Sequence, residues 1–239
     1  MSTLLDTRIT ELLGCKYPII QTAMGWVADP KLVAATGNAG GFGFLAGATI
    51  PPEQMEANIL EVKSLTDANF GVNFHMYQPN AAEIIDLVIK HGVKAVSYSR
   101  SPGKEMVARL KEAGVVCMPT VGLPKHAIKA VEMGADAVAV QGGEGGGHTG
   151  AIPTTLLLPQ VVDAVGDKVP VLGAGGFKDG RGKVIGAHAG QRATKAPNGS
   201  AAGMTEIAGG RDGRGNEMAL GGNEEGLRTG GNSGWVSRE

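Results

Sequence analysis

The sequence predicts an α/β protein of the TIM-like (β/α) barrel class, and three features of the chain support this fold. From residue 17 onward, short apolar runs rich in β-branched residues alternate with longer amphipathic segments, as in repeated βα units around a parallel sheet. Most of the amphipathic segments end at a glycine. Two units, KEAGVVCMP and VEMGADAVAV, share the order helix end, glycine, strand. This recurrence favours a barrel over a doubly wound sheet, which remains the alternative.

Seven short apolar runs are predicted as strands, at residues 18–21, 43–46, 70–74, 95–98, 115–120, 137–141 and 169–174. Between them, apolar residues at helical spacing predict helices over residues 30–39, 52–64, 81–91, 104–113, 125–133 and 159–165. Several helices have a proline in the first turn, and several stop at a glycine, namely Gly40, Gly92, Gly114 and Gly134. The helix boundaries thus have a physical basis at both ends.

The alternating pattern stops after residue 182. Residues 183–239 contain 14 glycines, one aromatic residue (Trp235) and nine residues from Val, Ile, Leu, Met and Trp. A βα unit of that composition cannot bury a core. We therefore expect a barrel core over residues 1–182 and a glycine-rich, poorly ordered tail over residues 183–239, which leaves the barrel incomplete at its C-terminal end. A truncation or a frameshift would give such a tail.

Composition excludes several classes of partner. The chain has 22 Lys and Arg residues against 23 Asp and Glu residues and no basic block, so a nucleic-acid partner is not predicted. Cys15 and Cys117 lie far apart without CxxC spacing, which predicts no metal site and two buried thiols in a reducing compartment. Asp6, Arg8 and Glu11 interrupt the N-terminal segment, and no apolar run reaches the roughly 18 residues of a membrane span. We expect a cytoplasmic protein with no membrane partner.

Three glycine-rich segments follow predicted strands, at residues 40–43, 141–148 and 173–177. Ligand sites of parallel βα arrays lie at the carboxyl ends of the strands. Glycine at these ends lets backbone N–H groups approach a phosphate or a flat ring closely. The later two segments are therefore candidate anion-binding turns, and tight βα turns without a ligand are the alternative.

Polar residues beside these glycines are candidates for chemistry. His148 follows three glycines just past the sixth predicted strand, where a neutral imidazole could act as a base or could hydrogen-bond a loop carbonyl. Glu144 could orient that imidazole, bind a ribityl hydroxyl or be solvated. Asn73 and Gln141 end strands, where an amide holds a ring edge or hydroxyls or serves a turn. The remaining histidines are assigned structural roles, namely His75, His91, His126 and His188.

Four ordered motifs resemble the nitronate monooxygenase family of FMN-dependent TIM-barrel enzymes: PIIQTAMGWVADPKLVAATGNAGGFGFL, FGVNFH, GADAVAVQGGEGGGHTG and PVLGAGGFKDGRG. The resemblance covers roughly residues 8 to 182. It implies that His148 matches the catalytic base of the family. It also implies FMN as the cofactor, contacted by Ala23, Met24, Asn73, Gln141, Gly146, Gly147, Ala174, Gly175 and Gly176. Thr120 stands near the flavin, where some members have a lysine.

The resemblance implies an oxidoreductase, and the first hypothesis is a nitronate monooxygenase. His148 would take the α-proton of a nitroalkane, or the nitronate would bind directly, with O₂ as the oxidant. A second hypothesis is an NAD(P)H-dependent flavin reductase of the enoyl-acyl-carrier-protein, quinone or steroid-degradation type. QGGEGGGHTG and TTLLLP are especially similar to the steroid-degradation type. Two hypotheses without catalysis are a phosphate or nucleotide binder and an inactive, truncated family member, because no eighth strand or GTRF segment follows GGFKDGRG.

Overall fold

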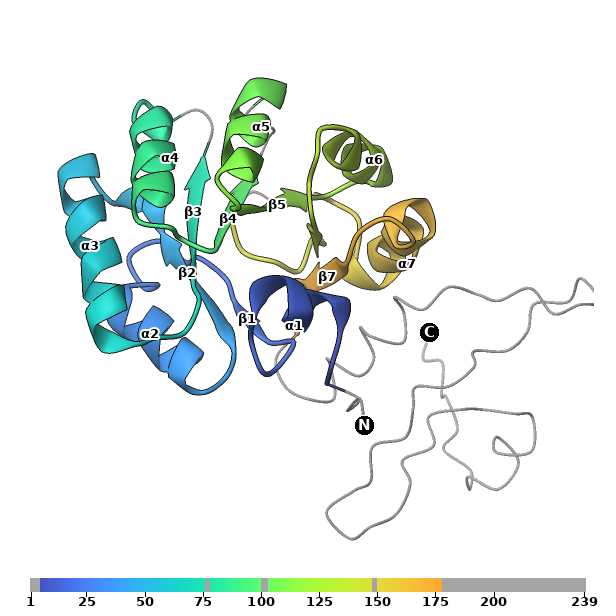
Figure 1. Ribbon diagram of the computed structural model, residues 1–239. Helices are drawn as coiled ribbons and strands as arrows, with labels where there is room; N and C mark the ends of the chain where they lie inside the picture. The colour runs from blue at the N-terminus through green and yellow to red at the C-terminus, as the bar shows by residue number, and fades with distance from the viewer. Residues whose placement is uncertain (1–4, 76–77, 100–102, 148–149, 178–239) are drawn as a thin grey trace, which may run out of the picture. The chain divides into compact units, whose positions relative to one another are not determined.

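The computed structural model describes residues 5–75, 78–99, 103–147 and 150–177. Within these residues seven strands form one parallel sheet in chain order, and the sheet curls with helices on its outside (Figure 1). The strands are β1 (Ile20–Gln21), β2 (Phe42–Ala46), β3 (Gly71–His75), β4 (Ala95–Ser99), β5 (Val116–Val121), β6 (Val138–Gln141) and β7 (Val171–Ala174). Sequential order without a reversal excludes the doubly wound alternative for this part of the chain.

Each crossover between neighbouring strands contains a helix. The helices are α1 (Arg8–Leu13), α2 (Pro30–Asn38), α3 (Pro52–Leu65), α4 (Ala81–Lys90), α5 (Lys104–Glu112), α6 (Pro124–Glu132) and α7 (Thr154–Val165), with a short 3₁₀ turn η1 (Gly47–Thr49) after β2. Helix α1 precedes β1, and the other six lie in the crossovers. None of the helices in the described residues is long and apolar enough to cross a membrane.

The predicted elements agree closely with the observed ones. All seven predicted strands are present, and each of their ends lies within two residues of the prediction. The glycines predicted to end helices have positive φ values: Gly40 (89°), Gly92 (59°), Gly114 (75°) and Gly134 (100°). Residues 178–239 lie outside the described residues, so the predicted boundary at residue 182 and the predicted disorder of the tail stay predictions.

Two helices and one cysteine differ from the sequence-based expectation. Helix α7 begins at Thr154, not at residue 159, because Glu144 caps its first turn and Pro159 is accommodated inside the helix. Helix α1 is absent from the predicted elements, and Thr7 starts it with a capping box. Cys117 is buried as expected, and burial raises the pKa of its thiol to about 12, whereas Cys15 is only partly buried.

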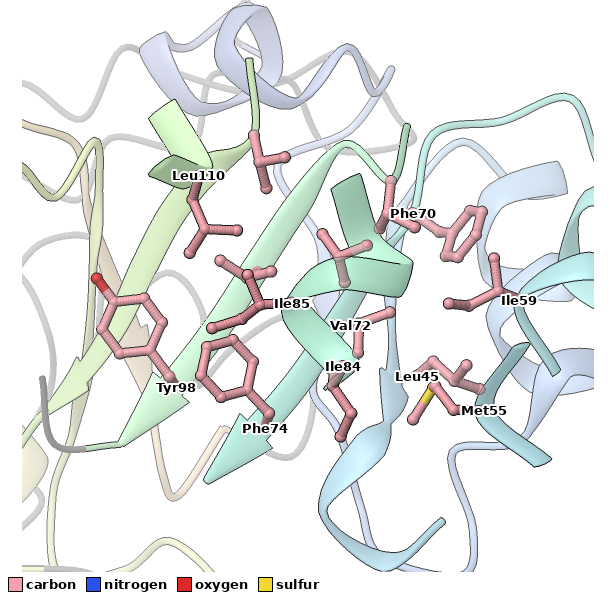
Figure 2. Packing of buried hydrophobic residues seen from close by; sticks show 14 of the residues in the cluster. Leu45, Met55, Ile59, Phe70, Val72, Phe74, Ile84, Ile85, Tyr98 and Leu110 are labelled. Carbon is pink, nitrogen blue, oxygen red and sulfur yellow. The ribbon is translucent and has the colours of Figure 1, made fainter. Parts of the chain in front are cut away.

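Alternate side chains of each strand pack on opposite faces of the sheet. On the outer face, Val72, Phe74 and Tyr98 pack with residues from α3, α4 and α5 such as Ile59 and Leu110 (Figure 2). The rings of Phe74 and Tyr98 stack with centroids 5.6 Å apart. This layer fixes the positions of β2 to β5.

The inner face of the curled sheet holds a second apolar cluster. Phe42, Phe44 and Met118 from the strands pack there with Ile9 and Leu13 of α1. Helix α1 therefore fills the inside of the curl rather than covering its outside.

Two hydrogen bonds fasten α1 to distant segments of the chain. The Arg8 guanidinium donates to the carbonyl of Gly166, 2.7 Å away, and so ties the segment before β1 to the segment before β7. The Asn69 side chain donates to the carbonyl of Leu13 at 3.0 Å. In the described residues β1 pairs with β2 and β7 pairs with β6, and no pairing joins β7 to β1. The described sheet is thus open between β7 and β1, and the predicted absence of an eighth strand, which concerns residues outside the described ones, stays a prediction.

Candidate active site

The register of the strands brings polar residues together at the carboxyl edge of the sheet. Asn73 of β3 pairs with Ser97 of β4, and Gln141 of β6 pairs with Ala174 of β7. Outward-facing neighbours on these strands, such as Val72 and Val140, belong to the packed outer layers. Alternation then places the four paired residues on the inner face.

The Asn73 amide is fixed by its neighbour on β4. Its Nδ2 donates to the carbonyl oxygen of Ser97 at 3.1 Å and to the Oγ of Ser97 at 3.0 Å. Both protons of the amide nitrogen are thus used, which leaves the side-chain oxygen of Asn73 as an acceptor. A ligand at this edge would therefore meet an acceptor whose direction is set before binding.

Sequence reasoning missed further residues on the same face. The register aligns His75 with Ser99, and Ser99 with Thr120. The sequence assigned His75 a structural role, yet it occupies the last inner-face position of β3. The alternation of Val72 and Phe74 with Asn73 and His75 was the signal that could have identified it. Thr120, a candidate from the sequence, lies at the same level on β5.

The loop after β6 is folded onto the end of its own strand. The Gln141 side chain donates from Nε2 to the carbonyl oxygen of Gly146 at 2.6 Å. A Cβ on Gly145 would lie 2.5 Å from the same Nε2, so a larger residue there would displace the Gln141 side chain. Gly147 has a φ of 77°. His148, the candidate base, lies outside the described residues.

The loops after β6 and β7 pack against each other. The N–H of Gly142 donates to the carbonyl of Ala174 at 3.3 Å. Gly175 has a φ of 94°, and a Cβ there would lie 3.0 Å from the backbone nitrogen of Gly145 and 3.1 Å from Oγ1 of Thr154. Positive φ and close backbone approach both require glycine at this position. Gly176 follows with a φ of 76°.

Glu144 links these loops to the start of α7. Its carboxylate accepts from the N–H of Thr154 at 2.9 Å and from the Thr154 hydroxyl at 2.8 Å. These hydrogen bonds hold the pKa of Glu144 below its ordinary value. In this arrangement the exposed carboxylate caps a helix, a role that the sequence analysis did not include, while the predicted contact with the imidazole of His148 lies outside the described residues.

The loop after β1 presents apolar side chains at the same edge. Ala23 packs against the inner cluster, whereas Met24 is 42% exposed and Trp26 is 90% exposed. The carbonyl of Met24 accepts from the N–H groups of Val27 and Ala28, which makes this a tight turn. Trp26 has a φ of 61°, an uncommon conformation for a bulky residue.

The donor set of this edge fits a flavin mononucleotide. Apart from His75, the polar side chains described on it are neutral amides and hydroxyls, which suit a ring edge and ribityl hydroxyls. Its last turn is formed by glycines, whose backbone N–H groups a phosphate can approach closely. Within the described residues, the carboxylate beside that turn, Glu144, is hydrogen-bonded to Thr154. No group of three His, Cys, Asp or Glu residues in the described ranges could hold a metal ion.

A curled parallel sheet with sequential βα units and glycine-rich turns at the carboxyl ends of its last strands defines the ligand-binding (β/α) barrel class. Within that class, the family model of nitronate monooxygenase matches residues 6–195. The chain belongs to the nitronate monooxygenase family, whose members are flavin-dependent oxidoreductases.

The relatives to which this chain is similar carry different named activities. The (3aS,4S,5R,7aS)-5-hydroxy-7a-methyl-1-oxo-octahydro-1H-indene-4-carboxyl-CoA dehydrogenase of Rhodococcus jostii is 54% identical over 182 residues, covering 76% of this chain and 51% of that protein. A probable nitronate monooxygenase of Staphylococcus saprophyticus is 34% identical, covering 75% of this chain and 63% of that protein. The chain thus spans about half the length of the first relative.

Solved structures give the same fold. FabK of Thermotoga maritima superposes with a TM-score of 0.74 at 34% identity, covering 78% of this chain and 60% of that one. This similarity confirms the predicted TIM-barrel-like fold class.

Proposed function

We propose that the protein is an FMN-dependent oxidoreductase that dehydrogenates a hydroxylated, fused-ring CoA ester. The observation that carries the substrate class is the 54% identity to the Rhodococcus dehydrogenase, against 34% to the probable nitronate monooxygenase. The motifs QGGEGGGHTG and TTLLLP, which are similar to the steroid-degradation type, also favour the CoA ester over a nitronate as the substrate. Nitronate oxidation with O₂, the first hypothesis from the sequence, becomes the second candidate.

The carboxyl edge of the sheet would hold the FMN. Asn73 would present its fixed side-chain oxygen to a ring N–H, while Gln141 would keep the β6 loop against its strand. Gly175 and Gly176 would turn backbone amides toward the phosphate. When bound, FMN accepts the two electrons that leave the substrate.

The remaining edge residues would serve substrate and proton transfer. His148, by its match to the family motif, would take the proton that leaves the oxidised centre of the substrate. Ala23, Met24, Gly146 and Gly147 would line the cofactor, and Thr120 would stand beside it. The exposed apolar face of Met24 suits a ring system better than a charged group.

The test begins with the purified full chain. Its visible spectrum is recorded, and the released cofactor is identified by mass. The bound flavin is then mixed without oxygen with the hydroxylated bicyclic carboxyl-CoA, with an alkyl nitronate or with NADH. Bleaching by the CoA ester supports the proposal.

Each remaining outcome favours a different hypothesis. Nitronate-dependent oxygen uptake without reaction of the CoA ester would establish the second candidate. Bleaching by NADH alone would identify a flavin reductase. A chain that binds no flavin, even when FMN is added in excess, would overturn all three activities and leave the hypothesis of a protein without catalysis.

A further inference from the structure

We propose that Glu144 is a positioning residue, which fastens the loop after β6 to the first turn of α7 and thereby sets the shape of the phosphate-binding turn after β7. The inference rests on the proposed function, because it assumes that this turn meets the phosphate of FMN. It assigns to Glu144 a role that acts through Thr154 and Gly175, not through contact with a ligand.

The cap of helix α7 comes from the beginning of the loop that joins β6 to α7, not from the residue directly before the helix. Helix α2 is capped locally, since Asp29 directly before it accepts from the N–H of Leu32 at 2.8 Å. The residue at the same position of α7 is Pro153, whose side chain makes no capping hydrogen bond. Glu144 supplies the cap from ten residues earlier in the chain. The cap therefore folds the first residues of the β6–α7 loop back onto the start of the helix.

The charge of Glu144 suits the end of the helix that it caps. The first turn of a helix presents unpaired N–H groups and a partial positive charge, which favours a carboxylate. Both carboxylate oxygens of Glu144 accept from the N–H of Thr154, at 3.2 Å and 2.9 Å, and one of them accepts the Thr154 hydroxyl as well. The N-terminus of α7 is therefore already satisfied by an anion of the chain itself.

The capped residue, Thr154, also contacts the turn after β7. Thr154 is 4% exposed, and its hydroxyl lies 3.4 Å from the carbonyl oxygen of Ala174. Gly175 packs beside that hydroxyl and beside the nitrogen of Gly145, the residue after Glu144. Displacing Glu144 would therefore weaken both contacts of Gly175, the one with the nitrogen of Gly145 and the one with the hydroxyl of Thr154.

The experiment compares Glu144→Gln with the wild type. The amide keeps the size of the side chain but replaces one acceptor with an NH₂ group, which cannot accept from Thr154. We expect FMN to bind about 10-fold more weakly, the order of one charge-assisted hydrogen bond. Amide exchange at Thr154 and Gly145 should be faster in the flavin-free protein. Glu132→Gln, which changes an exposed carboxylate at the end of α6, is the matched control and should alter neither.

Variants of the partner separate positioning from direct contact. Thr154→Ser retains both donors and should bind FMN as the wild type does. Thr154→Val removes the hydroxyl and should weaken FMN binding, as Glu144→Gln does. The loss of binding free energy in the double variant should not exceed the sum of the losses in the two single variants. If Glu144→Gln weakens binding while Thr154→Val and amide exchange stay unchanged, Glu144 touches the ligand and the proposal is wrong.

Failure of the proposed function gives a different result. A wild-type chain without affinity for FMN would overturn that function, whereas amide exchange at Thr154 would still report on the cap. Unchanged exchange in Glu144→Gln would overturn the positioning role whatever the ligand.

Discussion

The two ends of the described sheet are held together by different means. Strands β2 to β5 lie under one apolar layer of 19 buried residues, and every residue of β2 is buried. Strands β6 and β7 lie under a layer of nine, and no residue of β7 is fully buried. At this end polar contacts, from Gln141 to Gly146 and from Glu144 to Thr154, hold the loops. The contrast separates a well-packed apolar scaffold under β2 to β5 from the polar, glycine-rich loops after β6 and β7, and the two should respond differently to substitution.

The largest effect is expected at the binding edge, for His148→Ala. Loss of a positioned base should lower turnover by roughly 10² to 10⁴. The substrate is the CoA ester, or a neutral nitroalkane if the second candidate holds. If the second candidate holds, turnover of the nitronate should fall much less, because the nitronate is already deprotonated.

Flavin content and the midpoint of urea unfolding serve as controls for His148→Ala. Both should equal those of the wild type, because the base acts on the substrate. A variant that loses flavin and stability together would mark His148 as a structural residue.

The scaffold should show the opposite pattern for Phe74→Ala. Removing a ring that is 1% exposed and stacked on Tyr98 leaves a cavity, which should cost about 3–5 kcal/mol of unfolding free energy. The affinity of the folded fraction for FMN should not change. Leu60→Ala, at a residue of α3 that is 50% exposed, is the matched control and should cost far less. Equal losses in both variants would contradict the assignment of Phe74 to the core.

A smaller effect, with a defined pH dependence, is expected from Glu144. The hydrogen bonds from Thr154 hold the folded-state pKa of Glu144 below its ordinary value of 4.5. The stability they contribute is present above that value and is lost as the pH falls through the lower folded-state pKa. The wild type should therefore unfold at a higher urea concentration than Glu144→Gln at pH 7. The difference between the two urea midpoints should disappear in acid. A gap that stays constant with pH would show that the charge of Glu144 is not involved.

The smallest effect is expected for Arg109→Met in the scaffold. Arg109 and Asp86 join α5 to α4 at 2.6 Å, but their side chains are 54% and 58% exposed. Exposed pairs of this kind contribute between about 0 and 1 kcal/mol. Urea unfolding should therefore place the variant within about 1 kcal/mol of the wild type. A larger loss would mean that surface charge, and not the apolar layer alone, holds this end of the sheet.

Most of the scaffold could be predicted from the sequence, because its signals are local. Periodicity located the strands, and glycines such as Gly40 and Gly114 located helix ends through their left-handed conformation. The start of α7 was missed because its cap, Glu144, lies ten residues earlier in the chain instead of at the usual position directly before the helix. Helix α1 was missed because its few residues carry no long periodic pattern.

The candidate site was predicted only in part, because its arrangement depends on register between strands. Asn73 and Gln141 could be chosen as polar residues at strand ends. Ser97 and His75 gain significance only once β3 is aligned with β4. The position of His148 lies outside the described residues, so its role stays a prediction from the family motif.

A pair of glycine variants tests whether the glycine turn after β7 binds the cofactor phosphate, as proposed. Gly175 and Gly114 both have positive φ values, 94° and 75°, so valine is strained at either position. Gly175 lies at the carboxyl edge, whereas Gly114 lies before β5 at the opposite edge with nothing within 4 Å of an added Cβ.

FMN affinity is measured by fluorescence titration of the wild type, Gly175→Val and Gly114→Val, under conditions where all three are folded. We expect Gly175→Val to weaken binding by about 10-fold or more, since its side chain would block the approach to the backbone amides, and Gly114→Val to bind as the wild type does. Equal affinity of all three proteins would mean that the turn after β7 does not bind the phosphate.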